Sequence, residues 1–251
     1  MLILLPPSET KTTAARGLPL DLSRLSLPEL TATRASVVEA VAAVSHLEDA
    51  PARLGVSPNL AAEIARNTHL LTAPTAAAGR VYSGVLYEAL DLASMDTVSR
   101  RRAHRWLLVV SALFGAVRMG DRIPAYRLSM AVSLPPLGPL GSVWRGPLAA
   151  TLPRAAGHGL VVDCRSSTYA VAWVPRGPLA RRWVQIRVPG ATHLAKHTRG
   201  LVARHLCVSG VDVRSPTALA EVVGQTFDVE LTPPARSAQP WVLHTRAMRL
   251  R

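Results

Sequence analysis

The chain has 251 residues, of which 49% are hydrophobic and 4% aromatic, and it carries a formal net charge of +13 at pH 7. This hydrophobic content is enough for a full core, built mainly from Leu, Val and Ala. The positive charge favours an anionic partner such as nucleic acid, a nucleotide or an acidic membrane surface. A solvated, arginine-rich surface without a partner is the alternative interpretation.

Several classes of protein are excluded by what the sequence lacks. The two cysteines, Cys164 and Cys207, form no CxxC or Cys/His pattern, which argues against a structural zinc site and a disulfide framework. The apolar residues 1–5 run straight into two prolines without a basic leader, so no signal peptide is expected. No apolar run reaches the roughly 20 residues of a membrane span. We therefore expect a cytoplasmic monomer with no membrane partner, no metal and no cofactor.

Four short segments are expected to be strands. Residues 1–5, 106–110 and 160–162 are continuously apolar, as is typical of strands covered on both faces of a sheet. Residues 183–188 alternate between apolar and polar side chains, which predicts a strand nearer the edge.

Helical spacing of apolar residues fills most of the remaining chain. The predicted helices are 34–47, 60–71, 95–105, 143–156, 192–206 and 216–223. Residues 130–141 are rich in Pro and Gly and predict a loop or hairpin, and 232–240 predict another loop. Since there is no internal repeat and no long linker, we expect one domain over residues 1–251. Its predicted class is α+β, a compact mixed α/β domain with a central sheet, flanking helices and a basic cleft at the carboxyl ends of the strands.

Polar clusters follow three of the predicted strands. Ser8 and Glu9 follow the first strand, Ser111 follows the second, and Asp163 follows the third. Ligands of such sheets bind beyond the carboxyl ends of the strands, so we expect these clusters to converge on one cleft.

Lysine is rare in this chain. Only two of the 29 basic side chains are lysines, Lys11 and Lys196, and the rest are arginines. A buried lysine can act as a base, a nucleophile or a tight phosphate ligand, which arginine cannot do equally well. Both lysines are therefore candidate functional residues, although two ordinary surface lysines remain the simpler alternative.

Candidate site residues come from these polar segments. A carboxylate beside a lysine suits acid–base chemistry, while a structural ion-pair network is the alternative. Tyrosines in polar segments suit the binding of a planar ligand, or else lie at the rim of the core. The predicted catalytic residues are Lys11, Glu9, Asp163 and Lys196, and the predicted ligand-binding residues are Ser8, Tyr82, Tyr126, Arg127, Arg165, Ser166, Ser167, Tyr169 and Arg199.

Three further patterns are interpreted as structural. Gly115 and Gly120 could bring backbone amides to a phosphate, but a structural turn is preferred. His193 and His197 share a helix face, but no glutamate accompanies them as in zinc proteases, so no metal site is predicted. Cys164 lies beside an arginine that would lower its pKa, but a buried, inert thiol is preferred.

In chain order, several segments resemble the YaaA family of peroxide-stress proteins. They are residues 1–12, 82–85, 111–115, 121–130, 163–169 and 196–200, and Pro-Ala-Tyr-Arg-Leu-Ser-Met at 124–130 is the most specific. The resemblance implies a compact α+β fold with a positively charged cleft. It also implies DNA binding through a helix-hairpin-helix-like element and a role in limiting damage by hydrogen peroxide and iron.

Two functional hypotheses remain open. In the first, the protein is a non-enzymatic, sequence-independent DNA binder that shields nucleic acid. In the second, it is an enzyme that acts on a purine nucleoside, nucleotide or damaged base. A carboxylate opposite a lysine suits the cleavage or transfer of an N-glycosidic bond, because charge develops on both the sugar and the base.

Overall fold

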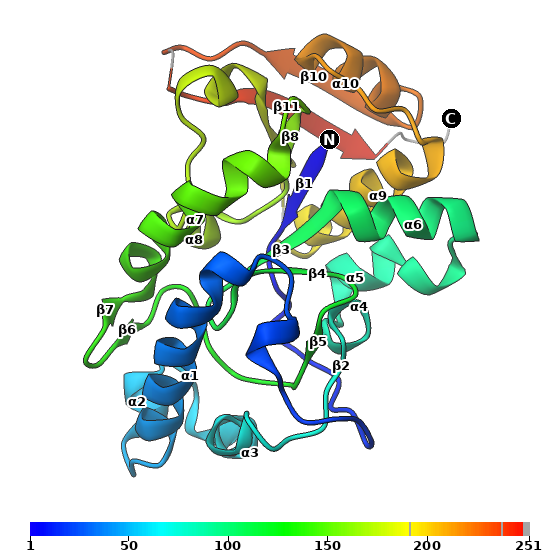
Figure 1. The fold of residues 1–251 in the computed structure, drawn as a ribbon. Helices are drawn as coiled ribbons and strands as arrows, with labels where there is room; N and C mark the ends of the chain where they lie inside the picture. The colour runs from blue at the N-terminus through cyan, green and yellow to red at the C-terminus, as the bar shows by residue number, and fades with distance from the viewer. Residues whose placement is uncertain (191, 237, 248–251) are drawn as a thin grey trace.

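Within residues 1–190, 192–236 and 238–247, which the computed structural model describes, a seven-stranded sheet forms the centre of the molecule (Figure 1). Its order is β10-β11-β9-β8-β1-β3-β4. β4 and β10 run antiparallel to their neighbours at the two edges, and the strands between them are parallel. The strands are β1 (Leu2–Leu5), β3 (Leu107–Ser111), β4 (Gly115–Arg118), β8 (Val161–Asp163), β9 (Trp183–Arg187), β10 (Phe227–Thr232) and β11 (Trp241–Ala247).

The three continuously apolar segments are confirmed as adjacent central strands. Every residue of β1, β3 and β8 is buried, as expected for strands with helices on both faces. In the register of the sheet, Ile3 pairs with Leu107 on one side and with Val162 on the other. This arrangement brings the polar residues that follow β1 and β8 side by side.

The prediction that residues 183–188 lie nearer the edge is wrong, because β9 pairs with β8 on one side and with β11 on the other. β10 and β11 extend the sheet beyond it, and neither was predicted as a strand. In β10 only Phe227 is buried, and exposed residues alternate with half-buried ones, so the strand lacks an apolar run. The expected loop 232–240 connects these two strands.

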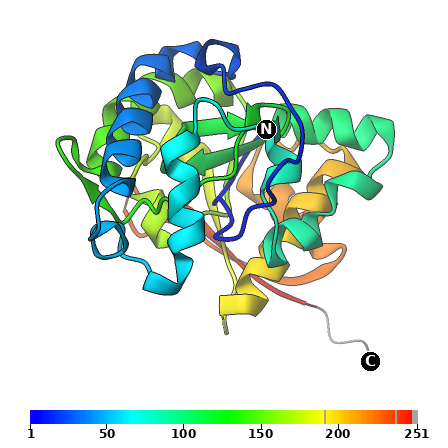
Figure 2. The same cartoon turned by 90° about the horizontal axis from the view of Figure 1, so that it is seen from below.

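Helices cover both faces of the sheet. α1 (Thr31–Ser45) and α7 (Leu140–Ala156) lie on one side, and α5 (Val85–Leu90), α6 (Thr97–Trp106), α9 (Thr192–Ser209) and α10 (Pro216–Gly224) lie on the other (Figures 1 and 2). Five of the six predicted helices are confirmed as α1, α6, α7, α9 and α10 among the described residues. The shorter elements are β2 (Ala76–Ala77), β5 (Arg122–Ile123), β6 (Ser133–Leu134), β7 (Gly138–Pro139), α2 (Ala50–Arg53), α3 (Ala61–Ala65), α4 (Ala78–Val81) and α8 (Ser167–Ala170).

The predicted helix 60–71 is divided into α3 and a 3-10 turn, Arg66–His69. The turn carries the buried Asn67, whose amide oxygen accepts from the backbone N–H of Arg127 at 2.9 Å and whose amide nitrogen donates to the Arg127 carbonyl at 2.8 Å. The break in the helix therefore holds the chain around Arg127 in place. Residues 130–141 form the β6–β7 hairpin, as one of the two expected alternatives.

Gly115 is confirmed as part of a structural turn. It opens β4 with a φ of +69°, and a Cβ at this position would lie 2.5 Å from the Trp144 ring. The Trp144 indole donates to the Ala112 carbonyl at 2.7 Å, which locks α7 against the β3–β4 hairpin. The glycine therefore serves packing.

The order of the strands creates a switch point at β1. The chain passes from β1 to β3 on one side of the sheet, and later places β8 on the other side. In open α/β sheets the connections that leave the carboxyl ends of the strands diverge at such a point and leave a crevice for ligands. None of the helices in the described part of the chain is both long enough and apolar enough to span a membrane.

Candidate functional site

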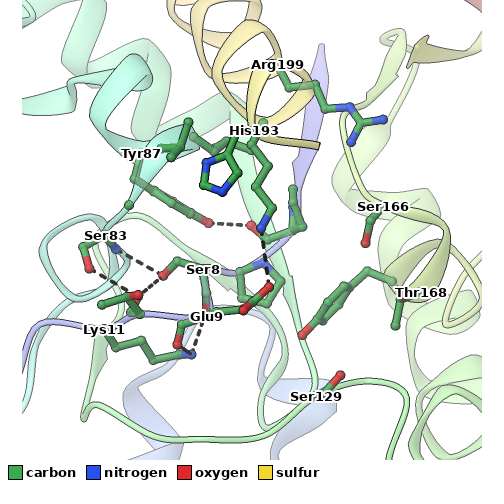
Figure 3. A pocket seen from close by; sticks show the side chains of 18 of the residues that line it. Ser8, Glu9, Lys11, Ser83, Tyr87, Ser129, Ser166, Thr168, His193 and Arg199 are labelled. Carbon is green, nitrogen blue, oxygen red and sulfur yellow. Dashed lines mark hydrogen bonds and ion pairs between the residues drawn. The ribbon is translucent and has the colours of Figure 1, made fainter. Parts of the chain in front are cut away.

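A cleft with a volume of about 780 Å³ opens beyond the carboxyl ends of β1 and β8 (Figure 3). This volume lies within the range of about 300–1,000 Å³ that is typical of small-molecule sites. Its walls come from residues 6–11 after β1, 55–56, 83–87, 127–129, 166–169 after β8, and from Gly190 and the start of α9. The cleft therefore lies at the switch point of the sheet.

Many of the candidate residues line this cleft, and both lysines are among them. Those in its wall are Ser8, Glu9, Lys11, Arg127, Ser166, Ser167, Tyr169, Lys196 and Arg199. The remaining candidates, Tyr82, Tyr126, Asp163 and Arg165, are buried behind the wall. The wall contains a carboxylate as well as basic groups, and a basic character of the cleft stays a prediction.

Asp163 and Arg165 form a buried ion pair, with both side chains 0% exposed. The carboxylate accepts from Arg165 Nη2 at 2.7 Å, from Arg165 Nε at 2.8 Å and from Trp183 Nε1 at 3.1 Å. The Arg165 guanidinium also donates to the Trp173 carbonyl at 2.9 Å. In contrast to the sequence-based expectation, these charges satisfy each other inside the fold and fix the segment that carries Ser166 and Ser167.

Tyr82 and Tyr126 form part of the core beneath the cleft. Their hydroxyl groups lie 3.0 Å apart, and that of Tyr126 lies 2.7 Å from Ser111 Oγ. Burial raises the pKa of both phenols well above the ordinary value, so both stay protonated. Neither residue is in the cleft wall, and both rings lie beneath the Lys11 side chain and support it. Tyr169 is the candidate tyrosine that reaches the wall.

Lys11 is the most unusual group in the cleft. The residue is only 7% exposed, and a backbone bridge to Tyr82 holds it in place. Its Nζ donates to the Ser8 carbonyl at 2.8 Å and to the Glu9 carbonyl at 3.4 Å (Figure 3). It also lies 4.2 Å from the centre of the Tyr126 ring. Burial, and after it the nearby charge of Arg127, lowers the pKa of Lys11 to about 7.

Glu9 and Lys196 form an exposed ion pair across the cleft mouth. The distance from Lys196 Nζ to Glu9 Oε1 is 3.4 Å, and the side chains are 41% and 74% exposed. An exposed pair of this kind contributes at most about 1 kcal/mol, so a bound ligand can replace it easily. Arg127 is held more firmly, since its Nη1 lies 3.2 Å from Glu63 Oε2 and both side chains are partly buried.

Several residues of the wall were not predicted from the sequence. Ser83, Ser129, Thr168 and His193 line the cleft together with the expected groups. The backbone N–H of Ser83 donates to Ser8 Oγ at 3.1 Å, which ties the segment before α5 to the one after β1. Ser83, Ser129 and Thr168 each lie in a segment that contained a named candidate, so proximity along the chain was the available signal.

Histidine, cysteine and acidic side chains are the groups that could support metal or thiol chemistry. Over the part of the chain that is described, no three His, Cys, Asp or Glu side chains gather where they could hold a metal ion. Cys164 is 0% exposed, and burial raises the pKa of its thiol to about 12, in agreement with the preferred interpretation of an inert thiol.

Fold and site together define an α/β protein with a polar cleft of mixed charge at the switch point of its sheet. A family model described as peroxide stress protein YaaA matches residues 1–231. The chain belongs to this family, and the resemblance drawn from the sequence motifs is confirmed.

The relatives of this chain are proteins of the UPF0246 group. One from Streptomyces coelicolor is 48% identical over 252 residues and covers 97% of each chain. Another from Corynebacterium efficiens is 40% identical and covers 92% of this chain and 95% of its own. A third from Corynebacterium glutamicum is 37% identical, with coverage of 83% and 86%.

Proposed function

We propose that this protein is an enzyme that acts at the glycosidic carbon of a nucleoside or nucleotide bound in the cleft. The observation that carries the proposal is Lys11, an amine buried in the cleft wall whose pKa is lowered to about 7. Strongly shifted pKa values in a cleft are typical of functional groups, because they let one side chain exchange protons near neutral pH.

The other residues of the wall fit the parts of such a ligand. The half-buried ring of Tyr169 offers an apolar face for a base, and the Ser129 and Thr168 hydroxyls can bond a sugar. Arg199 and Lys196 can hold a phosphate. Loss of the base leaves positive charge on the sugar, and the Glu9 carboxylate, which is 74% exposed in its ion pair with Lys196, can stabilise that charge.

The proposal predicts release of a free base from at least one member of a panel of purine nucleosides and their 5′-monophosphates. The rate should rise with pH through about 7, since the fraction of neutral Lys11 rises there. Chromatography of the reaction mixtures measures the base, and calorimetry measures binding of the same compounds. If the whole panel neither binds nor releases base, the proposal is wrong.

Non-specific binding of duplex DNA is a second candidate function. It is supported by the net charge of +13 and by α6, where Arg100, Arg101 and Arg105 are exposed. Arginines on a helix surface contact backbone phosphates without reading the bases. Either candidate would suit a member of a family described by peroxide stress, because nucleic acid and its bases are targets of oxidation.

DNA affinity is expected to fall steeply with salt, with a log–log slope of about −0.9 for each phosphate contact. The double variant Arg100→Gln/Arg101→Gln should reduce the slope by about 2, because each arginine accounts for roughly one contact. Titrations of a labelled duplex at several salt concentrations measure both slopes. Absence of binding at low salt, or an affinity independent of salt, would contradict the electrostatic account.

A further inference from the structure

We infer that Lys11 is a covalent nucleophile, whose amine forms an imine with C1 of a phosphorylated sugar in the cleft. The inference rests on the proposed function and gives it a mechanism and a substrate class. It concerns a step that an acid–base lysine would not carry out, and that step can be observed separately from base release.

The hydrogen bonds of Lys11 leave its lone pair available. A neutral amine has two N–H groups, and two backbone carbonyls, those of Ser8 and Glu9, lie at 2.8 Å and 3.4 Å from Nζ. Among the described residues no carboxylate lies within ion-pair distance of Nζ. The two carbonyls therefore use both donors and hold the nitrogen in a fixed orientation, as a nucleophile requires.

The surroundings keep a large share of this amine unprotonated. The carboxylates of Glu63 and Glu9 favour the charged form, but burial, and after it the Arg127 guanidinium, outweigh them and lower the pKa of Lys11 to about 7. Glu63 keeps Arg127 in place through an ion pair of 3.2 Å. Desolvation or a neighbouring cation can activate a lysine as a nucleophile, and both act on Lys11. Only two of the 29 basic side chains are lysines, and a lysine at this position fits the role, because a guanidinium cannot be deprotonated.

A place for the phosphate lies on another wall of the same cleft. Arg199 extends from α9 toward the side of the cleft that carries Ser166 (Figure 3). Its Nε donates to the Ile186 carbonyl at 3.4 Å, and none of the carboxylates in the described ranges pairs with its guanidinium. Arg199 and the hydroxyls of Ser166 and Ser167 together offer charge and hydrogen bonds for a phosphate group.

The proposed step balances without any further reactant except water. The Nζ lone pair attacks C1, the bond from C1 to the base breaks, and the base leaves with the electron pair and takes a proton. The new C1–Nζ bond becomes an imine when the ring C1–O bond breaks, and the ring oxygen takes the proton lost by Nζ. Water then hydrolyses the imine, which releases the sugar phosphate and restores the amine. A free sugar phosphate enters the same imine directly through its open-chain aldehyde, with loss of water.

Reductive trapping tests the inference. The intact protein is incubated with sodium cyanoborohydride and ribose 5-phosphate, or with a duplex oligonucleotide that holds one abasic site, the other source of the same sugar chemistry. We expect a protein adduct heavier by the sugar compound less one oxygen atom, formed faster as the pH rises through about 7. Peptide mapping should place the adduct on Lys11. A product with only one of the two compounds identifies the source of the sugar.

Two variants and two independent outcomes keep this test decisive. Lys11→Arg should give no adduct, while Arg154→Lys, which keeps Lys11 and adds an exposed lysine outside the cleft wall, should still give the adduct on Lys11. An adduct on Lys196 or on the terminal amine, or no adduct with either compound, overturns the inference. Peptide mapping of the parent protein gives this answer even if a variant fails to fold. Release of base without trapping leaves the proposed function standing and the nucleophile wrong, whereas trapping without release leaves the nucleophile standing and the proposed function wrong.

Discussion

Replacement of Lys11 by arginine is expected to lower the rate of base release by about 10²- to 10⁴-fold, the range of a well-placed acid or base. Arginine keeps the positive charge but cannot lose its proton, so the neutral amine is gone at every pH near 7. Base release and DNA affinity are measured on the same preparation. The affinity for DNA should be unchanged, because the variant keeps the net charge of +13.

Arg154→Lys is the matched control for this variant. It makes the opposite exchange at a side chain that is 70% exposed and paired with Glu29, and it should leave base release unchanged. Full activity of Lys11→Arg would contradict the assignment of Lys11 and make DNA binding the better account of the protein.

The pH dependence of stability gives a second check on Lys11. Its pKa is about 7 in the folded protein against 10.5 for the unperturbed side chain, so the unfolded chain binds more protons between these values. The free energy of unfolding therefore rises with pH across this window. Below about pH 7 Lys11 is protonated in both states, and this stabilisation is lost. Lys11→Met should remove this part of the slope in denaturant titrations at pH 7 and pH 9. An unchanged slope would mean that the folded pKa is not lowered.

The central strands could be predicted from the sequence, whereas the edge of the sheet could not. β1, β3 and β8 are buried on both faces and therefore leave unbroken apolar runs. β10 has one buried residue and therefore no apolar pattern that would predict a strand. It pairs with β11 as an antiparallel hairpin. Pairing between these two strands is stabilised by backbone hydrogen bonds, which leave no mark on the pattern of side chains.

Part of the candidate site could likewise be predicted from the sequence, and part could not. The scarcity of lysine pointed to Lys11 and Lys196 equally, and both lie on the cleft. Only the packing separates them: Lys11 is fixed above the Tyr126 ring and nearly buried, whereas Lys196 is 41% exposed. The sequence carries no signal for this difference, because the ring that supports Lys11 lies more than a hundred residues away along the chain.

The structural role of Asp163 could not be predicted from its position at the end of a strand. It is the last residue of β8, where a catalytic carboxylate would be expected, but Arg165, two residues on, folds back to neutralise it. The third partner, Trp183 Nε1, comes from the neighbouring strand and is visible only in the fold. Carboxylate and guanidinium together act as a buried clamp on the segment that leads to Ser166.

Asp163→Ala is accordingly expected to be among the most destabilising substitutions in this protein, at about 3–5 kcal/mol, since it leaves the buried Arg165 charge without its partner. For a chain of this size the loss corresponds to roughly 2–4 °C in Tm for each kcal/mol. Denaturant titration and thermal melting measure it. Asp228→Ala is the control: its carboxylate is 67% exposed and lies 3.9 Å from Arg246, so removal should cost at most about 1 kcal/mol.

If Asp163→Ala melted like the parent protein but lost base release, Asp163 would be a catalytic group, and its assignment as a structural ion pair would be wrong. A large loss of stability, with base release retained in the fraction that stays folded, would instead establish that the charge next to the cleft supports the wall and takes no part in the chemistry.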